Sequence, residues 1–393
     1  MKLIHTADWH LGQSFFQNDR KEEHTLFLAW LRGQVKTHEV DVLLIAGDVF
    51  DTPNPSAESQ RQYYAFLKEI TAENSALQII IIAGNHDSAA RLEAPNPLLE
   101  TMNVTVRGGV KRTEDGEINF NHLIVTLDKG GCCLAVPYLR QGDYPDSATY
   151  AEGVQAMYRE IFERVQDKNE PIIAMGHLQA TGSEISQNDR AERTIIGGLE
   201  AISPDSFNKV TYTALGHLHR AQRVSGRENV RYAGAPLPMS FAEKNNKQGV
   251  TLVTITDKTE IERLEFDVPV KLLSIPREPL PLSDVLSEIE LLPDGEVCKT
   301  SPFLEIKVLI TEPEPSLRMQ IEKALEGKAV RLARIESKSF GNESDKYTVS
   351  YEELQKINPL NMATDIFKRK YGGDAMPETM KELLETVIRE VER

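Results

Sequence analysis

From residue 1 to about residue 267, short apolar runs alternate with amphipathic stretches, and several of the apolar runs end in polar residues. The clearest example is IIIIAGNHD, where the apolar run Ile79–Ala83 leads directly into Gly84, Asn85, His86 and Asp87. A continuous, mostly β-branched run of this length is typical of a strand buried on both faces of a parallel sheet. The polar residues therefore follow the strand's carboxyl end, where ligands bind in open α/β sheets.

The same arrangement occurs at four further apolar segments. These segments end in residues that can bind metal ions, namely Asp8 and His10, Asp48 and Asp51, His177, and His217 and His219. One such ending is weak evidence, because every strand meets a loop in this way. Taken together, the five endings predict that Asp, His and Asn side chains gather at one edge of a sheet.

Amphipathic stretches between the apolar runs predict helices near residues 20–37, 58–72 and 150–167. Strands alternating with helices indicate an α/β domain over residues 1–267. The later segments VTLVTIT and IERLEF alternate apolar and polar residues, which predicts a second sheet packed on the first. The helix near 58–72 has more aromatic surface than one buried face needs; we favour core packing, with a dimer contact as the alternative.

The pattern changes after residue 267. The segments PREPLPL, FLEIKVLI, PSLRMQIEKALEG and VRLARIES predict a small α+β capping domain over residues 268–340. Residues 341–393 are expected to form a polar linker and two amphipathic helices, the last over Pro377–Val391. Such a helical pair is too small for a core of its own, so it either packs on its own domain or binds a partner.

The chain has 393 residues and a formal net charge of -15, which argues against unassisted binding to nucleic acid. Nucleic acid stays possible as a substrate, because divalent cations or a basic partner subunit can neutralise phosphate. No apolar run is long enough to span a membrane and no signal-peptide pattern is present, so we expect a cytoplasmic protein. The three cysteines lack metal-type spacing and are expected to be buried free thiols.

The candidate metal ligands offer both oxygen and nitrogen atoms. They are Asp8, His10, Asp48, Asn85, His177, His217 and His219. This set is large enough for two divalent ions that share one carboxylate, and it suits Mn²⁺, Fe²⁺ or Zn²⁺ better than Mg²⁺. Two such ions can activate water and stabilise the attacking and leaving oxygens at phosphorus. The sequence therefore predicts hydrolysis of phosphate esters.

The polar segments, in their order along the chain, resemble the five motifs of the calcineurin-like metallophosphoesterase superfamily. The matching segments are DWH, GDVFD, GNHD, GH at His177 and GHLH at residues 216–219. Within the superfamily, HTADWHLGQ, GDVFDTPNP and RYAGAPLPMSF resemble the double-strand-break repair nucleases. The resemblance implies a two-sheet sandwich flanked by helices, followed by the small domain and the helical tail.

The resemblance also implies roles for individual residues. One metal ion would be held by Asp8, His10 and His219, and the other by Asn85, His177 and His217, with Asp48 bridging the two ions. His86 would not bind metal but would face the scissile phosphate, stabilise the transition state and assist the leaving oxygen. Asp51 would orient His86.

At the level of function, the resemblance implies a Mn²⁺-dependent double-strand exonuclease and single-strand or hairpin endonuclease. An SbcC-type ATPase would bind the C-terminal helices, and the sequence itself has no GxxxxGK[ST] loop. A homodimer within a heterotetramer is implied, with contacts near residues 58–72 and 95–102. The alternatives are a phosphodiesterase or phosphatase acting on a small molecule or phosphoprotein, and a scaffold without metals. A scaffold would lack ligands, and none is missing.

Overall fold

The structure is a computed structural model that describes residues 1–166, 170–184, 201–310 and 314–339, together with a few positions between 364 and 384. The chain divides into two compact units, residues 1–338 and residues 339–393. The predicted polar linker and most of the predicted C-terminal helices lie outside the described residues. Within the part that is described, no helix is both long and apolar enough to cross a membrane.

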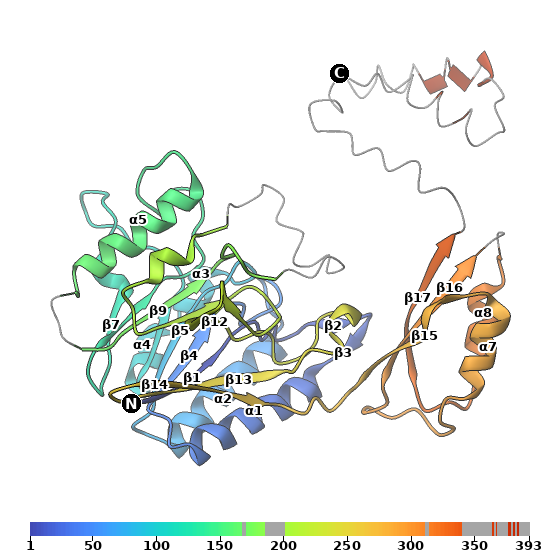
Figure 1. Ribbon diagram of the computed structural model, residues 1–393, viewed down its shortest axis with the longest axis horizontal. Coiled ribbons are helices and arrows are strands. Elements are labelled where there is room, and N and C mark those ends of the chain that lie inside the picture. Colours follow the sequence, from blue (N-terminus) through green and yellow to red (C-terminus); the bar gives the residue numbers. More distant parts are fainter. Residues whose placement is uncertain are drawn as a thin grey trace. The chain divides into compact units, whose positions relative to one another are not determined.

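The first sheet has six strands in the order β14-β13-β1-β4-β5-β6 (Figure 1). Its strands are β1 (Lys2–Thr6), β4 (Val42–Ala46), β5 (Gln78–Ile82), β6 (Val104–Arg107), β13 (Gly249–Ile255) and β14 (Thr259–Glu265). The strands β1, β4, β5 and β6 are parallel, whereas β13 is antiparallel to β1. The strands β4 and β5 are fully buried runs, as the apolar pattern predicted.

The second sheet has the order β11-β12-β10-β9-β8-β7. Its strands are β7 (Ile124–Thr126), β8 (Cys132–Ala135), β9 (Ile172–His177), β10 (Tyr212–Gly216), β11 (Gln222–Val224) and β12 (Arg227–Tyr232). The prediction that VTLVTIT and IERLEF form this second sheet was wrong, because they lie in β13 and β14 and extend the first sheet beside β1. Alternating polarity identifies a strand with one buried face, but it does not identify the neighbouring strand.

The two sheets pack face to face, and helices cover their outer faces. The layer between the sheets is apolar and includes Leu44, Ile80, Ile82, Ile173, Met175 and Ala214. The helices α1 (Lys21–Thr37) and α2 (Ala57–Glu73) cover the first sheet, and α5 (Tyr150–Glu163) covers the second. The predicted two-sheet sandwich flanked by helices is confirmed, although α5 ends four residues before the predicted residue 167.

Short elements complete this part of the chain. They are the hairpin β2 (Ser14–Phe15) and β3 (Asn18–Asp19), the helices α3 (Ala89–Glu93) and α4 (Asn96–Leu99), and the 3-10 turns η1 (Glu100–Met102), η2 (Phe120–Leu123), η3 (Pro204–Phe207) and η4 (Phe241–Glu243). The predicted contact helix near 95–102 corresponds to α4 and η1. Cys132 and Cys133 are buried free thiols, as expected, but Cys298 is exposed.

An α+β module follows the sandwich. Its elements are β15 (Leu272–Leu280), α7 (Leu282–Glu290), β16 (Phe303–Ile310), α8 (Leu317–Ala324) and β17 (Arg331–Ser339). The strands form one sheet in the order β15-β16-β17. The module has an apolar core that includes Val285, Ile289, Leu304, Ile306 and Ile321. Because it belongs to the same compact unit as the sandwich, the domain boundary at residue 267 stays a prediction.

Candidate metal centre

The five predicted ligand segments come together in space, but from two sheets rather than from the edge of one. The segments after β1, β4 and β5 leave the first sheet, and those at β9 and β10 leave the second (Figure 1). The His217 backbone N–H donates to Asp8 Oδ1 at 2.9 Å, which joins the two sets. His177 Nδ1 lies 2.9 Å from the carbonyl oxygen of Ala46, which joins them again. The site is therefore assembled only when the sandwich closes.

Asp48 lies at the centre of this cluster. The ligand atoms of Asp8, His10 and His219 lie within 4.8 Å of one another. Two further groups with the same spacing both contain Asp48, one with Asp8 and His177 and the other with His10 and His86. A carboxylate shared between groups is the arrangement that a bridging ligand requires.

Asn85 lies among the remaining candidate ligands. Its Oδ1 lies 3.0 Å from His177 Nε2 and 3.1 Å from His217 Nδ1. His177 Nε2 in turn lies 3.2 Å from Asp48 Oδ2. The structure thus brings all the predicted ligands into one cluster, in which Asp48 connects the Asp8 side to the Asn85 side.

Two lone-pair atoms in the cluster fit a metal ion. Asp8 Oδ2 and His10 Nε2 are buried, and neither has a hydrogen-bond partner among the described residues. A buried polar group without a partner costs about 1–3 kcal/mol. A divalent cation would satisfy both atoms, because carboxylate oxygen and imidazole nitrogen are common ligands of such ions. The donor set therefore fits the divalent ions expected for the site.

The pKa values of the clustered side chains differ because their electrostatic surroundings differ. Burial opposes the charged form of Asp48, but His177, His10 and His86 outweigh it and hold its pKa well below the usual range. Burial and the neighbouring His177 lower the pKa of His217 to about 3, so this imidazole is neutral at pH 7. Burial lowers the pKa of His177, yet the carboxylates of Asp48 and Asp8 raise it overall, to about 9. A cation bound there would displace that proton, so metal binding should depend on pH.

The backbone of the site is strained. Asp8, His10, Asp48 and His217 have positive φ angles of 54°, 48°, 49° and 104°. Residues other than glycine rarely adopt this region, and each instance costs about 1–3 kcal/mol. Four such residues among the candidate ligands show that the surrounding packing fixes the side chains in place, which is common at functional sites.

Glycines allow the loops to approach closely. A Cβ atom at Gly84 would collide with Asp48 Oδ1, and a Cβ atom at Gly216 would collide with the carbonyl oxygen of Ala46. These contacts join the loop after β5 to the loop after β4, and one sheet to the other. The glycines that precede the ligands in the sequence are therefore required by packing at the site.

His86 is held by the backbone of Asp51. Its Nδ1 lies 2.8 Å from the Asp51 carbonyl oxygen, and its backbone N–H donates to Asp48 Oδ1 at 2.8 Å. The Asp51 carboxylate lies elsewhere, with Oδ1 3.2 Å from His10 Nδ1. We expected Asp51 to orient His86, and the contact between them is made by the main chain. Residue spacing indicates which residues are neighbours but not which atoms meet.

Sequence analysis missed the structural role of Asp87. Its side chain is buried and accepts hydrogen bonds from the backbone N–H groups of Val49, Phe50 and Gly84 at 3.1, 2.9 and 2.9 Å. Burial and the nearby Asp48 raise the pKa of Asp87 to about 6, against the effect of these donors. Asp87 ties the loop after β4 to the loop after β5. Its position in the GNHD segment was the only available signal.

The chain belongs to the calcineurin-like phosphoesterases, because residues 1–221 match the model of that family. It is thus a phosphoesterase by family, and this family implies divalent metal ions. Residues 268–371 match the SbcD_C family, which is described as the type 5 capsule protein repressor C-terminal domain.

Curated relatives narrow the family further. A protein of Rhodobacter capsulatus, named as the SbcD subunit of the SbcCD nuclease, is 37% identical over 352 residues, which cover 85% of this chain and 86% of the relative. The protein of the same name from Escherichia coli K12 is 28% identical over 404 residues, covering 98% and 96%. The one from Bacillus subtilis is 31% identical over 271 residues, covering 64% and 66%. The chain is therefore a member of the SbcD family.

Proposed function

We propose that this chain is a metal-dependent DNA nuclease that works with an SbcC-type ATPase in DNA repair, recombination and replication. It would act as an exonuclease on double-stranded ends and as an endonuclease on single strands and hairpins. The observation that carries the proposal is the cluster of ligand atoms around Asp48 in a member of the SbcD family, with His86 beside it. Bacterial DNA lies in the cytoplasm, so we expect the protein there.

We infer that the site holds two divalent ions. Asp8, His10 and His219 would hold one ion, Asn85, His177 and His217 would hold the other, and Asp48 would bridge them. When bound, the ions supply positive charge that activates water and stabilises the attacking and leaving oxygens at phosphorus. The mixture of carboxylate, amide and imidazole ligands favours Mn²⁺ over Mg²⁺.

His86 is the residue we assign to proton transfer. A neutral His86 whose Nδ1–H donates to the Asp51 carbonyl oxygen carries its lone pair on Nε2. Protonation of Nε2 converts it into a donor that can stabilise charge on the phosphate and give its proton to the leaving oxygen. The hydrogen bond to the main chain keeps the ring oriented, so Asp51 acts as a positioning residue. Its carboxylate does the same for His10.

The proposed activity is tested with hairpin DNA, Mn²⁺ and the ATPase partner. Cleavage that requires all three components would support it. If the hairpin stays intact while bis(p-nitrophenyl) phosphate is hydrolysed, the alternative gains support, a phosphodiesterase or phosphatase that acts on a small molecule or phosphoprotein. Elemental analysis after metal reconstitution provides a separate check, because a protein that holds no metal would favour the scaffold.

We further propose a division of labour along the chain. Residues 1–267 would form the nuclease domain, residues 268–340 a capping domain, and residues 341–393 the segment that binds the ATPase. A basic partner would also offset the net charge of -15, which otherwise repels DNA. Truncation after Phe340 should then preserve diester hydrolysis and weaken partner binding, and an unchanged affinity in a pull-down would remove this segment from the interface. Light scattering would test the expected homodimer within a heterotetramer.

A further inference from the structure

We propose that Glu243 is a positioning residue for His219, and that the turn η4 makes its position depend on packing against the α+β module. The inference rests on the proposed role of His219 as a metal ligand. It concerns a residue outside the five phosphoesterase motifs, in the segment that directly follows RYAGAPLPMSF.

Glu243 faces His219 at short range. Its Oε1 lies 3.5 Å from His219 Nδ1, and the exposed fractions of the two side chains are only 3% and 8%. The other oxygen, Oε2, accepts a hydrogen bond from the Met239 backbone N–H at 3.1 Å. Burying a carboxylate is costly unless it is paired. The Met239 backbone N–H and the Ser240 hydroxyl donate to this carboxylate, and the imidazole of His219 faces it from the side of the site.

The contact between Glu243 Oε1 and His219 Nδ1, at 3.5 Å, favours one ring nitrogen of His219 as the metal ligand. A ligand histidine usually donates its second ring N–H to a carboxylate or carbonyl group, which sets the tautomer and the ring orientation. With Nδ1 facing Glu243, we assign Nε2 of His219 as the nitrogen that would bind the ion. His10 and His177 make the corresponding Nδ1 contacts at shorter range, 3.2 Å to the Asp51 carboxylate and 2.9 Å to the Ala46 carbonyl oxygen. Glu243 would complete this pattern for His219.

The same turn also contacts the module. Phe241 opens η4, and its ring lies 5.3 Å from that of Phe15. Phe15 lies 4.9 Å from Phe303, the first residue of β16. These rings form one buried cluster with Val270 and Leu272, at the start of the module. Phe241 and Glu243 are two residues apart in one 3-10 turn, so we expect a shift of the aromatic cluster to reach the carboxylate that faces His219.

The structure leaves room for such a shift. A cavity of about 440 Å³ lies beside the turn, lined by residues that include Glu243, Gln248, Val268 and Leu272. The turn thus packs against the aromatic cluster and His219 on one side and borders the cavity on the other. We therefore infer that the packing of the module on Phe241 determines the position of the Glu243 carboxylate.

The first test uses the full-length metal-free chain titrated with Mn²⁺, with binding followed by electron paramagnetic resonance and calorimetry. We expect Glu243→Gln to weaken the binding of one of the two Mn²⁺ ions by about 10–100-fold and the binding of the other by less than about threefold. The control is Glu265→Gln, which removes an exposed charge from the wall of the same cavity and should change neither affinity. Unchanged affinities in Glu243→Gln, or an equal loss for both ions accompanied by a lower melting temperature, would overturn the positioning role.

The second test asks whether the module acts through Glu243. Phe303→Leu should weaken the binding of the same ion by about three- to tenfold in the wild-type background. In the Glu243→Gln background it should have almost no further effect on that affinity. Additive effects of the two substitutions would overturn the coupling. If Phe303→Leu does not fold, Phe241→Leu perturbs the same cluster from the sandwich side and gives the same comparison.

The two proposals fail in different ways. Wild-type protein that binds no Mn²⁺ would overturn the metal centre and this inference together. Wild-type protein that binds two ions, with a Glu243→Gln variant that binds them equally well, would overturn only this inference.

Discussion

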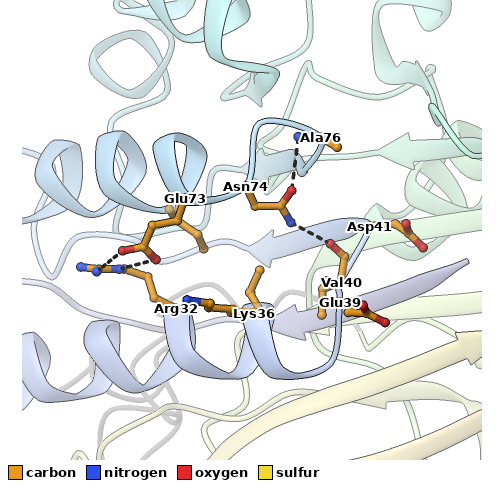
Figure 2. Close-up of a pocket in the computed structure, with 10 residues that line it drawn as sticks. Arg32, Lys36, Glu39, Val40, Asp41, Glu73, Asn74 and Ala76 are labelled. Atoms are coloured by element: carbon orange, nitrogen blue, oxygen red, sulfur yellow. Dashed lines mark hydrogen bonds and ion pairs between the residues drawn. The ribbon is translucent and has the colours of Figure 1, made fainter.

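The two ends of the parallel strands in the first sheet carry similar charged residues in different surroundings. At the carboxyl ends, Asp8 and Asp48 are buried within the candidate metal centre. At the amino ends, a pocket of about 330 Å³ lies between the last turns of α1 and α2 (Figure 2). There, Figure 2 shows Arg32 paired with Glu73 across the two helices and Asn74 joined to the main chain of Val40.

The difference lies in burial and in unmet bonding capacity. Arg32 and Glu73 have side chains that are 27% and 43% exposed, so water solvates them and the pair contributes about 0.2–1 kcal/mol. The metal centre instead has buried lone pairs without partners and strained backbone around them. A pocket lined by charges is therefore weak evidence of chemistry, whereas buried groups that need a cation are strong evidence.

The substitution with the largest expected effect is Asp48→Ala at the carboxyl ends. Removing the shared carboxylate should disturb both ions and reduce hydrolysis of bis(p-nitrophenyl) phosphate by about 10⁴-fold or more. Elemental analysis should show loss of both metals. A variant that keeps two ions would break the assignment of Asp48 as the bridging ligand.

His86→Ala should have the next largest effect. Loss of the proton donor should lower kcat by about 10²–10⁴-fold while both ions stay bound, because this residue is assigned to proton transfer and not to metal binding. Kinetics and metal content measured on the same preparation separate the two roles. Metal loss as large as that in Asp48→Ala would show that His86 is a ligand.

Asp87→Ala tests the contribution of burial to stability. Three buried backbone N–H groups would lose their acceptor, so the free energy of unfolding should fall by about 3 kcal/mol or more in urea titrations. The matched control is Asp41→Ala at the amino ends, where the carboxylate accepts from the Lys2 N–H at 2.8 Å in a partly exposed position. The control should cost less than about 1 kcal/mol, since water can replace that acceptor. Equal losses would contradict the contrast.

The stability of the protein should depend on pH because of the buried residue His24. Its Nε2 lies 2.9 Å from the carbonyl oxygen of Trp9, which stands between Asp8 and His10 in the sequence. Burial and the nearby Arg20 lower the pKa of His24 to about 3. Between about pH 6.5 and 3 the unfolded state binds the proton and the folded state does not, so stability falls as pH falls. In chelator-treated protein, His24→Gln should remove on the order of 2 kcal/mol of the stability lost between pH 7 and pH 5. Parallel curves for both proteins would contradict this.

Arg32→Ala, in the pocket at the amino ends, should have the smallest effect. We expect a loss of less than about 1 kcal/mol that shrinks as salt concentration rises, with unchanged diester hydrolysis. Thermal unfolding at low and high salt measures it. A loss of activity would show that the pocket takes part in function and would remove the contrast between the two ends.

Much of the fold could be predicted from local pattern. The buried run Ile79–Ile82 and the amphipathic segments that became α1 and α2 gave elements with nearly correct bounds, because burial on one or two faces imposes a definite period on the sequence. The pairing of β13 with β1 could not be predicted this way. These strands lie more than 240 residues apart, and no local period records which partner a strand finds.

The residue types at the site were predictable for a chemical reason. Metal ligation requires lone pairs from a few types of side chain, and the sequence shows where such residues follow apolar strands. This pattern pointed to the seven candidate ligands and to His86. Local sequence could not determine the atoms that hold them. Three contacts show this, because each joins segments that are distant in sequence. They are the contact of the Asp51 carbonyl oxygen with His86, that of the Asp87 carboxylate with the Phe50 N–H, and that of Glu243 with His219.

The sequence by itself determined which side chains are available for chemistry and where strands end, since both follow from residue type and local period. Tertiary structure alone decided that two sheets, rather than one, present those side chains to a common point, and that main-chain, carboxylate and amide groups contact the imidazoles of His10, His86, His177 and His217. The physical reason is that these contacts cross between chain segments, and their geometry exists only after the apolar layer between the sheets has formed.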